Sequence, residues 1–164
     1  LLHIRTIVVT NNQILRRLRY AFDFNDNSMM RIFAHGGLET TRAQVSDWLK
    51  KDEDPAFVQI SDLELAQFLN GLIIEKRGRK EGPQPEPESK LNHNIVFRKL
   101  KIALDLKDDD ILAILLLADF RLSKHELSAF FRRPDHHHYR ACQDQVLRNF
   151  IKGVQLKLRQ HSEE

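Results

Sequence analysis

The amino-acid sequence predicts an all-α protein made of two tandem homologous four-helix domains, helix-turn-helix-like in part. Two observations predict this fold. Apolar residues recur at helical spacing along most of the chain, and sustained alternation with a period of two residues is absent. A shift of 82 residues aligns Asn12–Gly78 with Asn94–Gln160 without a gap, and 13 of the 67 aligned pairs are identical. A gapless match across loops as well as helices indicates that one folded unit was duplicated.

The duplication divides the 164 residues into two repeats, a linker and two ends. Three prolines and mixed charges predict that the linker is extended and solvated. The N-terminal segment LLHIRTIVVT lacks the cleavage pattern of a signal peptide, and the sequence leaves its origin open. The predicted parts are a leader (1–11), the first repeat (12–78), a Pro/Glu-rich linker (79–93), the second repeat (94–160) and a tail (161–164).

Each repeat is predicted to begin with two helices. The first spans about Asn12–Asp23, where apolar residues three and four apart share one face. Asp26 is predicted to be the N-cap of the second helix, which Gly36-Gly37 ends. The equivalent helix of the second repeat, Ile111–Phe120, is too apolar for an ordinary amphipathic helix. We therefore expect extra burial there, at a contact between repeats or between subunits.

Two more helices are predicted in each repeat. Thr41 and, in the copy, Ser123 are expected to cap the third helix. Trp48 and Phe130 then occupy equivalent positions on the face that meets the core. After a proline-containing loop, the fourth helix is predicted to begin near position 62 or 144.

Composition narrows the functional class. The chain has 26 basic and 23 acidic side chains, a net charge of +3, and no apolar run near the roughly 20 residues that cross a bilayer, so no membrane partner is expected. Its single cysteine, Cys142, is typical of a reducing, cytoplasmic compartment, and its alignment with Ile60 predicts a buried side chain. No nucleophile–base pattern, phosphate-binding glycine loop or carboxylate pair is recognisable. We therefore predict a protein that is not an enzyme, with no cofactor and no identified small-molecule substrate.

The basic charge is concentrated in the second repeat, which predicts an anionic partner there. Asn12–Gly78 carries a net charge of −1, whereas Asn94–Gln160 carries +5. In addition, Ser28–Lys51 resembles a helix-turn-helix, in which the second helix reads the major groove. An ordinary helical hairpin would show the same apolar pattern, so both interpretations stay open. The candidate contact residues are Arg42 and Gln44 in the first repeat and Lys124, Arg132 and Arg133 in the second.

A basic triplet lies on the first helix of both repeats. It consists of Arg16, Arg17 and Arg19 in one copy and of Arg98, Lys99 and Lys101 in the other. Such residues can hold phosphates, but more often they pair with nearby carboxylates, here Asp23 and Asp105, or simply solvate the helix, and this second interpretation is preferred.

The histidine run at His136–His138 does not predict a metal site. Zinc ligands converge from spaced positions, whereas adjacent side chains in a loop point in different directions. The run Asp108–Asp110 is expected to complement the dipole of the helix that it opens. We expect no metal centre.

Several segments resemble the YehS-like family, which is built from two copies of a domain of unknown function (1456). They are NNQILRRLRYAFDFND, VSDWLKK and the pair SDLELAQFLNGLI and QDQVLRNFIKGV, and the resemblance runs from Asn11 to Arg159. It implies a cytoplasmic bacterial protein and brings no activity, cofactor or catalytic residue. The leader before Asn11 departs from the family pattern.

Together these observations predict a non-enzymatic binding or regulatory protein. Nucleic acid, RNA or DNA, is the leading partner, bound through basic helix faces of the second repeat. The alternative is a protein–protein interaction or homodimerisation module, with Ile111–Phe120 and the region of Trp48 and Phe130 at the contact.

Overall fold

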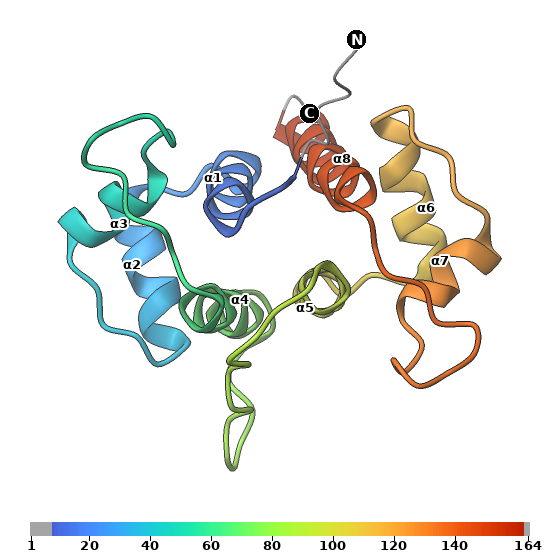
Figure 1. Cartoon of the computed structure of the whole chain (residues 1–164), viewed down its shortest axis with the longest axis horizontal. Helices are drawn as coiled ribbons and strands as arrows, with labels where there is room; N and C mark the ends of the chain where they lie inside the picture. Colours follow the sequence, from blue (N-terminus) through green and yellow to red (C-terminus); the bar gives the residue numbers. More distant parts are fainter. Residues whose placement is uncertain (1–7, 163–164) are drawn as a thin grey trace, which may run out of the picture.

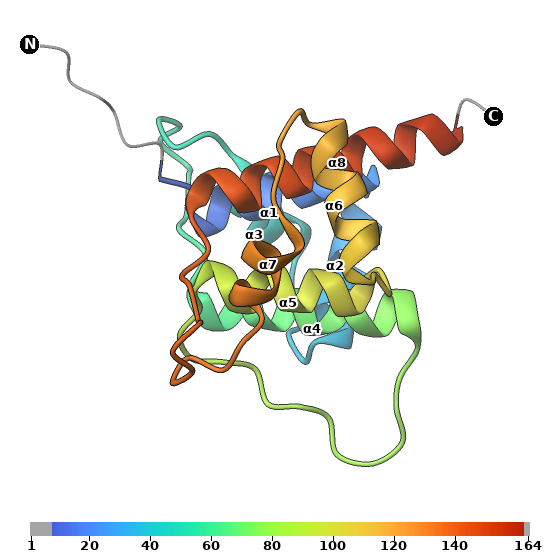
Figure 2. The same cartoon turned by 90° about the vertical axis from the view of Figure 1, so that its right-hand side faces the viewer.

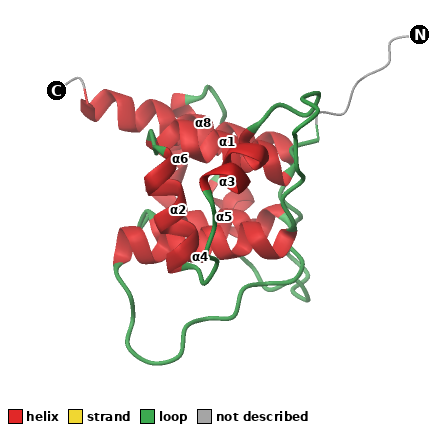
Figure 3. Cartoon of the chain, turned by 90° about the vertical axis from the view of Figure 1, so that its left-hand side faces the viewer, coloured by secondary structure: helices red, strands yellow, loops and turns green. Residues whose placement is uncertain are grey.

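The computed structural model describes residues 8–162, and over that range it contains helices and loops but no strand (Figures 1 and 3). The predicted all-α class with two four-helix units is confirmed. The helices are α1 (Asn11–Phe22), α2 (Asp26–His35), α3 (Arg42–Leu49), α4 (Asp62–Arg77), α5 (His93–Ala103), α6 (Asp108–Leu117), α7 (Lys124–Phe130) and α8 (Asp144–Ser162).

Each helix of the second repeat begins 82 positions after its counterpart, as α1 at Asn11 and α5 at His93 illustrate. The predicted caps of the third helices are confirmed. The hydroxyls of Thr41 and Ser123 accept from the backbone N–H three residues on, and the side chains of Gln44 and Glu126 return the contact. These reciprocal hydrogen bonds satisfy two amides that the helix itself leaves unpaired.

The predicted cap of α2 is wrong by one residue. Asn25 is the N-cap, because its backbone is extended and its side-chain oxygen accepts from the N–H of Ser28 at 2.8 Å. Asp26 is the first helical residue, where its charge complements the helix dipole. In the second repeat Lys107 holds the cap position and offers no side-chain oxygen.

The first and last helices of the two repeats form the centre of the molecule (Figure 1). Helix α1 packs against α8, and α4 packs against α5, so the same pair of elements meets twice across the repeats. Helices α2 and α3 flank this centre on one side and α6 and α7 on the other (Figures 1 and 2). The arrangement is an approximate two-fold packing of one repeat on its copy.

Equivalent polar contacts join the two repeats at both places. The N–H of Val9 donates to Asp144 at 2.8 Å, and the N–H of Leu91, which is equivalent to Val9, donates to Asp62 at 2.9 Å. Each carboxylate also contacts the first residue of α1 or α5: His93 lies 2.6 Å from Asp144, and Asn11 donates to Asp62 at 2.6 Å. The contacts between the repeats are therefore duplicated along with the fold.

The core of each repeat is built around one central phenylalanine ring, but the ring comes from a different helix in each repeat. In the first, the Phe33 ring of α2 lies 5.1 Å from Trp48 and 4.9 Å from Phe68. In the second, the Phe97 ring of α5 takes this central role, 4.7 Å from Phe150. Leu15 occupies the position equivalent to Phe97, and Leu115 occupies the position equivalent to Phe33. The volume of the core is therefore similar in the two repeats, although the ring lies on a different helix.

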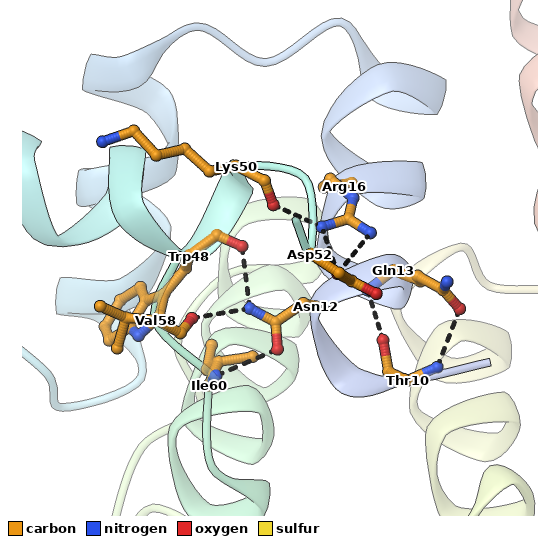
Figure 4. A network of polar contacts seen from close by, with 9 residues as sticks. All are labelled: Thr10, Asn12, Gln13, Arg16, Trp48, Lys50, Asp52, Val58 and Ile60. Carbon is orange, nitrogen blue, oxygen red and sulfur yellow. Dashed lines mark hydrogen bonds and ion pairs between the residues drawn. The ribbon is translucent and has the colours of Figure 1, made fainter. Parts of the chain in front are cut away.

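A buried asparagine organises each repeat (Figure 4). The amide nitrogen of Asn12 donates to the carbonyls of Trp48 and Val58, both at 2.9 Å, and its oxygen accepts from the N–H of Ile60 at 3.2 Å. Asn94 makes the same three bonds, to residues 130, 140 and 142. One side chain thus holds the loop that leads into the fourth helix against the first.

Helix α6 does not lie at the contact between the repeats, so that expectation is wrong. Its main partners are α7 and α8 of its own repeat, on the outer side of the molecule (Figure 1). Ile111, Ile114 and Leu115 are buried there, whereas Leu116 is 49% exposed. The apolar run is explained by burial within the repeat, and a contact with another subunit stays untested.

Candidate nucleic-acid interface

Six of the predicted contact residues form ion pairs within the chain. Arg16 also donates to the carbonyl of Lys50 at 2.6 Å, which ties α1 to the end of α3 (Figure 4). Side chains held in this way have part of their charge neutralised before a polyanion arrives. The pairs are Arg16–Asp52 (3.3 Å), Arg42–Asp26 (3.4 Å), Lys99–Glu88 (2.9 Å), Lys101–Asp108 (3.1 Å), Lys124–Asp109 (3.6 Å) and Arg133–Asp135 (3.4 Å).

Neither basic triplet pairs with the carboxylate that the sequence suggested for it. In the described part of the chain, Asp105 pairs instead with Arg77 of the other repeat at 2.7 Å. The main chain at Asp23 and Asp105 is left-handed, with φ of 55° and 53°, where each chain turns after its first helix. The carboxylates that do pair with the triplets lie outside the first helices: Asp52 in the loop after α3, Glu88 in the linker and Asp108 at the start of α6.

In the helix-turn-helix-like segment, the side chains predicted to contact a nucleic acid are engaged by nearby residues of α2 and by the N-cap of α3. Its two helices are separated by Gly36–Thr41, longer than the turn of about three to four residues that joins such helices. Gln44 is engaged in the capping box of α3, and Arg42 turns back to Asp26 and Asn27 on α2. This segment is held as a helical hairpin by its own polar contacts.

Four predicted residues, Arg17, Arg19, Arg98 and Arg132, form no ion pair with any residue in the 8–162 range. Arg98 lies in a shallow open hollow of about 420 Å³ between the repeats, together with Arg77, Asp105 and Phe131. Lys101 lies on the same wall, 4.4 Å above the Phe131 ring.

Arg17 belongs to a larger basic surface that the sequence analysis missed. This surface follows the line where α1 and α8 meet, and we call it the α1–α8 seam. It consists of Arg17 and Tyr20 from α1 and of Arg148, Lys152 and Arg159 from α8. Residues 148, 152 and 159 recur at helical spacing, so they project from one face of α8.

Three cations of the α1–α8 seam have no ion-pair partner among the described residues. Arg17, Arg148 and Lys152 form no hydrogen bond or ion pair with another described residue. Partial burial, and then repulsion by Arg148 and Arg16, lowers the pKa of the Arg17 guanidinium. Asp144, one turn before Arg148 on α8, acts electrostatically on Arg148 without forming an ion pair with it. Like charges held close together are stabilised when an anion binds between them.

Helices α1 and α8 together carry seven basic side chains and one acidic one, Asp144. This carboxylate already contacts His93 and accepts a hydrogen bond from the N–H of Val9. Burial opposes its ionisation, but these hydrogen bonds together with the charges of His93 and Arg148 outweigh burial and hold the pKa of Asp144 below its usual value. The basic residues are Arg16, Arg17, Arg19, Arg148, Lys152, Lys157 and Arg159.

An aromatic ring lies within this basic surface. Tyr20 is 53% exposed, and the guanidinium carbon of Arg159 lies 4.6 Å from the centre of its ring. An exposed aromatic ring flanked by cations is the arrangement that stacks bases of single-stranded nucleic acid.

The equivalent surface at α4 and α5 is different. These two helices carry five basic and three acidic side chains, and the linker adds Glu88, whose carboxylate lies 2.9 Å from Lys99. The linker loops out beneath α4 and α5, on the opposite side of the molecule from α1 and α8 (Figures 1 and 2). Of the two equivalent surfaces, the one at α1 and α8 is open, whereas the linker contributes a carboxylate to the one at α4 and α5.

A sequence signal for the α1–α8 seam did exist. Between Gln145 and Ser162 the chain has no acidic residue, although four basic ones recur there. The positions equivalent to Arg148 and Lys152 in the first repeat are Ala66 and Asn70, so the comparison of the repeats marks these charges as specific to the second. The pairing of α8 with α1 is what turns this stretch into a surface.

Other kinds of site find no support in the described residues. Burial raises the pKa of the Cys142 thiol to about 12, so this side chain is a buried hydrophobe, as predicted, and a poor nucleophile. Between residues 8 and 162 no group of three or more His, Cys, Asp or Glu could hold a metal ion. Over the same range no helix is long and apolar enough to cross a membrane.

The fold defines a class of all-helical protein with two tandem repeats, in which the first helix of each repeat packs against the last helix of the other. A family model described as "Protein of unknown function (DUF1456)" matches residues 11–78 and 93–160. The chain belongs to this family, and the predicted resemblance is confirmed. It is 49% identical over 152 residues to the "Uncharacterized protein YehS" of Escherichia coli (strain K12), covering 92% of this chain and 96% of that protein. No solved structure matches it.

Proposed function

We propose that this protein is a non-enzymatic, cytoplasmic nucleic-acid-binding protein that holds its ligand along the α1–α8 seam. The observation that carries this proposal is the basic surface where α1 packs against α8, which holds the unpaired Arg17, Arg148 and Lys152 and, one turn beyond Arg17 on α1, the exposed ring of Tyr20. Cations that lie along one line bind successive phosphates, and the ring offers a stacking surface for a base. The seam therefore favours single-stranded RNA or DNA over a duplex read through the major groove.

The residues predicted from the sequence contribute unequally to this proposal. Arg17 lies at the centre of the seam, and Arg19 follows it on α1. Lys124, Arg132 and Arg133 lie in and after α7, at the outer edge of the second repeat, and they form the rival surface. Homodimerisation is not favoured by a specific observation, since Trp48 and Phe130 are buried in their own repeats.

The two surfaces can be separated by variants that remove equal charge. Arg148→Ala with Lys152→Asn introduces the residues found at the equivalent positions 66 and 70, which the same fold already accommodates. Arg132→Ala with Arg133→Ala is the matched control. We expect the first variant to weaken retardation of a single-stranded oligonucleotide at low salt at least about fivefold, and to reduce the slope of log affinity against log salt by about 1.5.

The control variant should bind nearly as wild type does. Absence of retardation for the wild-type protein at low ionic strength would refute nucleic-acid binding altogether. A larger loss in the control than in the seam variant would instead place the ligand on the helix-turn-helix-like face of the second repeat.

A further inference from the structure

The α4–α5 seam repeats the geometry of the α1–α8 seam, but the linker occupies it. Lys99 corresponds to Arg17, and Asn70 corresponds to Lys152. The Nζ of Lys99 lies 2.9 Å from Glu88 Oε1 and donates to Asn70 Oδ1 at 2.5 Å. The Lys99 side chain is only 12% exposed, so its charge is held in a narrow space between α4, α5 and the linker.

The carboxylate leaves hydrogen-bonding groups at this place unsatisfied. Asn70 is 8% exposed, and its amide nitrogen has no hydrogen-bond partner among the described residues. The Oε1 of Glu88 is also buried, and its contact with Lys99 is an ion pair without hydrogen-bond geometry. A buried donor and a buried acceptor thus lie beside Lys99 without being matched, which is unfavourable for both.

A phosphate group has the features that this space lacks. It carries more acceptor oxygens than a carboxylate and a larger charge, so it can accept from the ammonium of Lys99 and from the free amide of Asn70 at the same time. Both groups are donors: the ammonium of Lys99 contacts Glu88, and the amide nitrogen of Asn70, whose oxygen accepts from Lys99, is left without a partner.

We propose that the α4–α5 seam is a second anion-binding site, specific for phosphate groups, and that Glu88 of the linker occupies it as an internal competitor. The linker can vacate the site because residues 78–92 form no helix and contain three prolines. The end of the linker before α5 is anchored to the start of α4 by the N–H of Leu91 on Asp62. A ligand must displace Glu88, so its apparent affinity falls by the fraction of time that the site is open.

The test replaces the competitor and leaves the site intact. Glu88→Gln removes the charge that holds Lys99, and Glu86→Gln is the matched control, since Glu86 is an exposed linker glutamate two residues away with no contact to the seam. Inorganic pyrophosphate is titrated into each full-length protein while the side-chain amide of Asn70 is followed by NMR. We expect Glu88→Gln to bind about tenfold more tightly at this amide, as if the site had been open one-tenth of the time.

A double variant shows that the gain belongs to this site. Adding Lys99→Met to Glu88→Gln keeps the aliphatic stem between the helices and should abolish the response of Asn70. Equal affinities for wild type, Glu88→Gln and Glu86→Gln, or a response that survives Lys99→Met, would overturn the proposal. Circular dichroism confirms that each variant is folded.

A second arm identifies the source of the phosphate. If nucleic acid uses this site, Glu88→Gln increases retardation of a single-stranded oligonucleotide, and Glu86→Gln does not. If only pyrophosphate gains affinity, the site serves a small phosphorylated molecule. The outcome is independent of the proposed function, since the seam variant Arg148→Ala with Lys152→Asn tests the opposite surface.

Discussion

At the scale of single residues, Asn12 and Asn94 hold each repeat together from within. Each is almost fully buried, and each satisfies three backbone groups, from the end of the third helix and the loop after it, more than thirty positions away. A carboxylate at either position would have no donors to offer to the two carbonyls, and an apolar side chain would satisfy none of the three groups. The position therefore requires an amide.

We expect Asn12→Ala to lower the free energy of unfolding by about 2–4 kcal/mol, because two carbonyls and one amide lose a buried partner. Urea unfolding followed by circular dichroism measures this change. Asn149→Ala is the control, since the amide of Asn149 bonds only to the carbonyl of Gln145 on the same helix, and its loss should cost under about 0.5 kcal/mol. Equal losses for the two variants would contradict the role assigned to Asn12.

Local patterns predicted the caps Thr41 and Ser123 because a capping box involves only four consecutive residues. The error at Asp26 has the same origin, since two neighbouring residues could both cap and only the backbone conformation decides between them. The identity of Asn12 with Asn94 was visible in the alignment, but its meaning depended on loop carbonyls that no local pattern reveals.

At the scale of helices, glycine sets the closest approaches. A side-chain carbon on Gly71 would lie 1.8 Å from the carbonyl oxygen of Ile32, and on Gly153 it would lie 2.1 Å from that of Ile114. Helices α4 and α8 therefore cross α2 and α6 with backbone in contact. This explains why the glycine is identical in the two repeats.

We expect Gly153→Ala to destabilise the protein by about 3 kcal/mol or more, because the two helices must move apart and disturb the packed core around them. The measurement is the midpoint of urea unfolding at constant slope. Lys152→Ala, at the exposed neighbouring position of α8, should change stability by less than about 0.5 kcal/mol. A tolerated Gly153→Ala would mean that α6 and α8 are less closely packed than described.

Helical periodicity predicted where the helices lie but not which of them face each other. The apolar face of α6 was expected at the contact between repeats, yet it meets α7 and α8, because the periodicity of a helix shows that a face is buried and not what buries it. The basic residues of α8 were overlooked for the same reason. They became a surface only when α1 was found beside them.

At the scale of the whole molecule, the two repeats are joined by matched contacts at Asp62 and Asp144. Duplication could be read from the sequence, but a duplicated domain can be packed on its copy in many ways. The contacts that select this arrangement involve main-chain N–H groups of Val9 and Leu91, which carry no sequence signature.

We expect the contribution of Asp144 to stability to depend on pH. Its folded pKa is depressed, so its stabilisation is fully present above the unfolded aspartate value of about 3.9 and is lost as pH falls through the lower folded value. Asp144→Asn should therefore be less stable than wild type at pH 7, by about 1 kcal/mol, and the gap should close in acid.

Urea unfolding of both proteins between pH 2 and pH 7 measures this gap, in steps of about one unit across the titration range of aspartate. Asp109→Asn serves as the reference, because Asp109 is exposed and its contact with Lys124 is long, at 3.6 Å. A gap for Asp144→Asn that is independent of pH would show that the loss comes from packing and not from the charge.

The pairing of α1 with α8 also fixes an order of events during synthesis. Helix α1 leaves the ribosome first and α8 last, and the two are separated by the stretch from Asn11 to Asp144. At about 5–20 residues per second, α1 waits on the order of ten seconds for the partner that covers its side. The pairing of α4 with α5, by contrast, can form as soon as α5 has emerged, because only the linker separates the two helices. In the nascent chain, the contact between α4 and α5 can therefore form before the contact between α1 and α8.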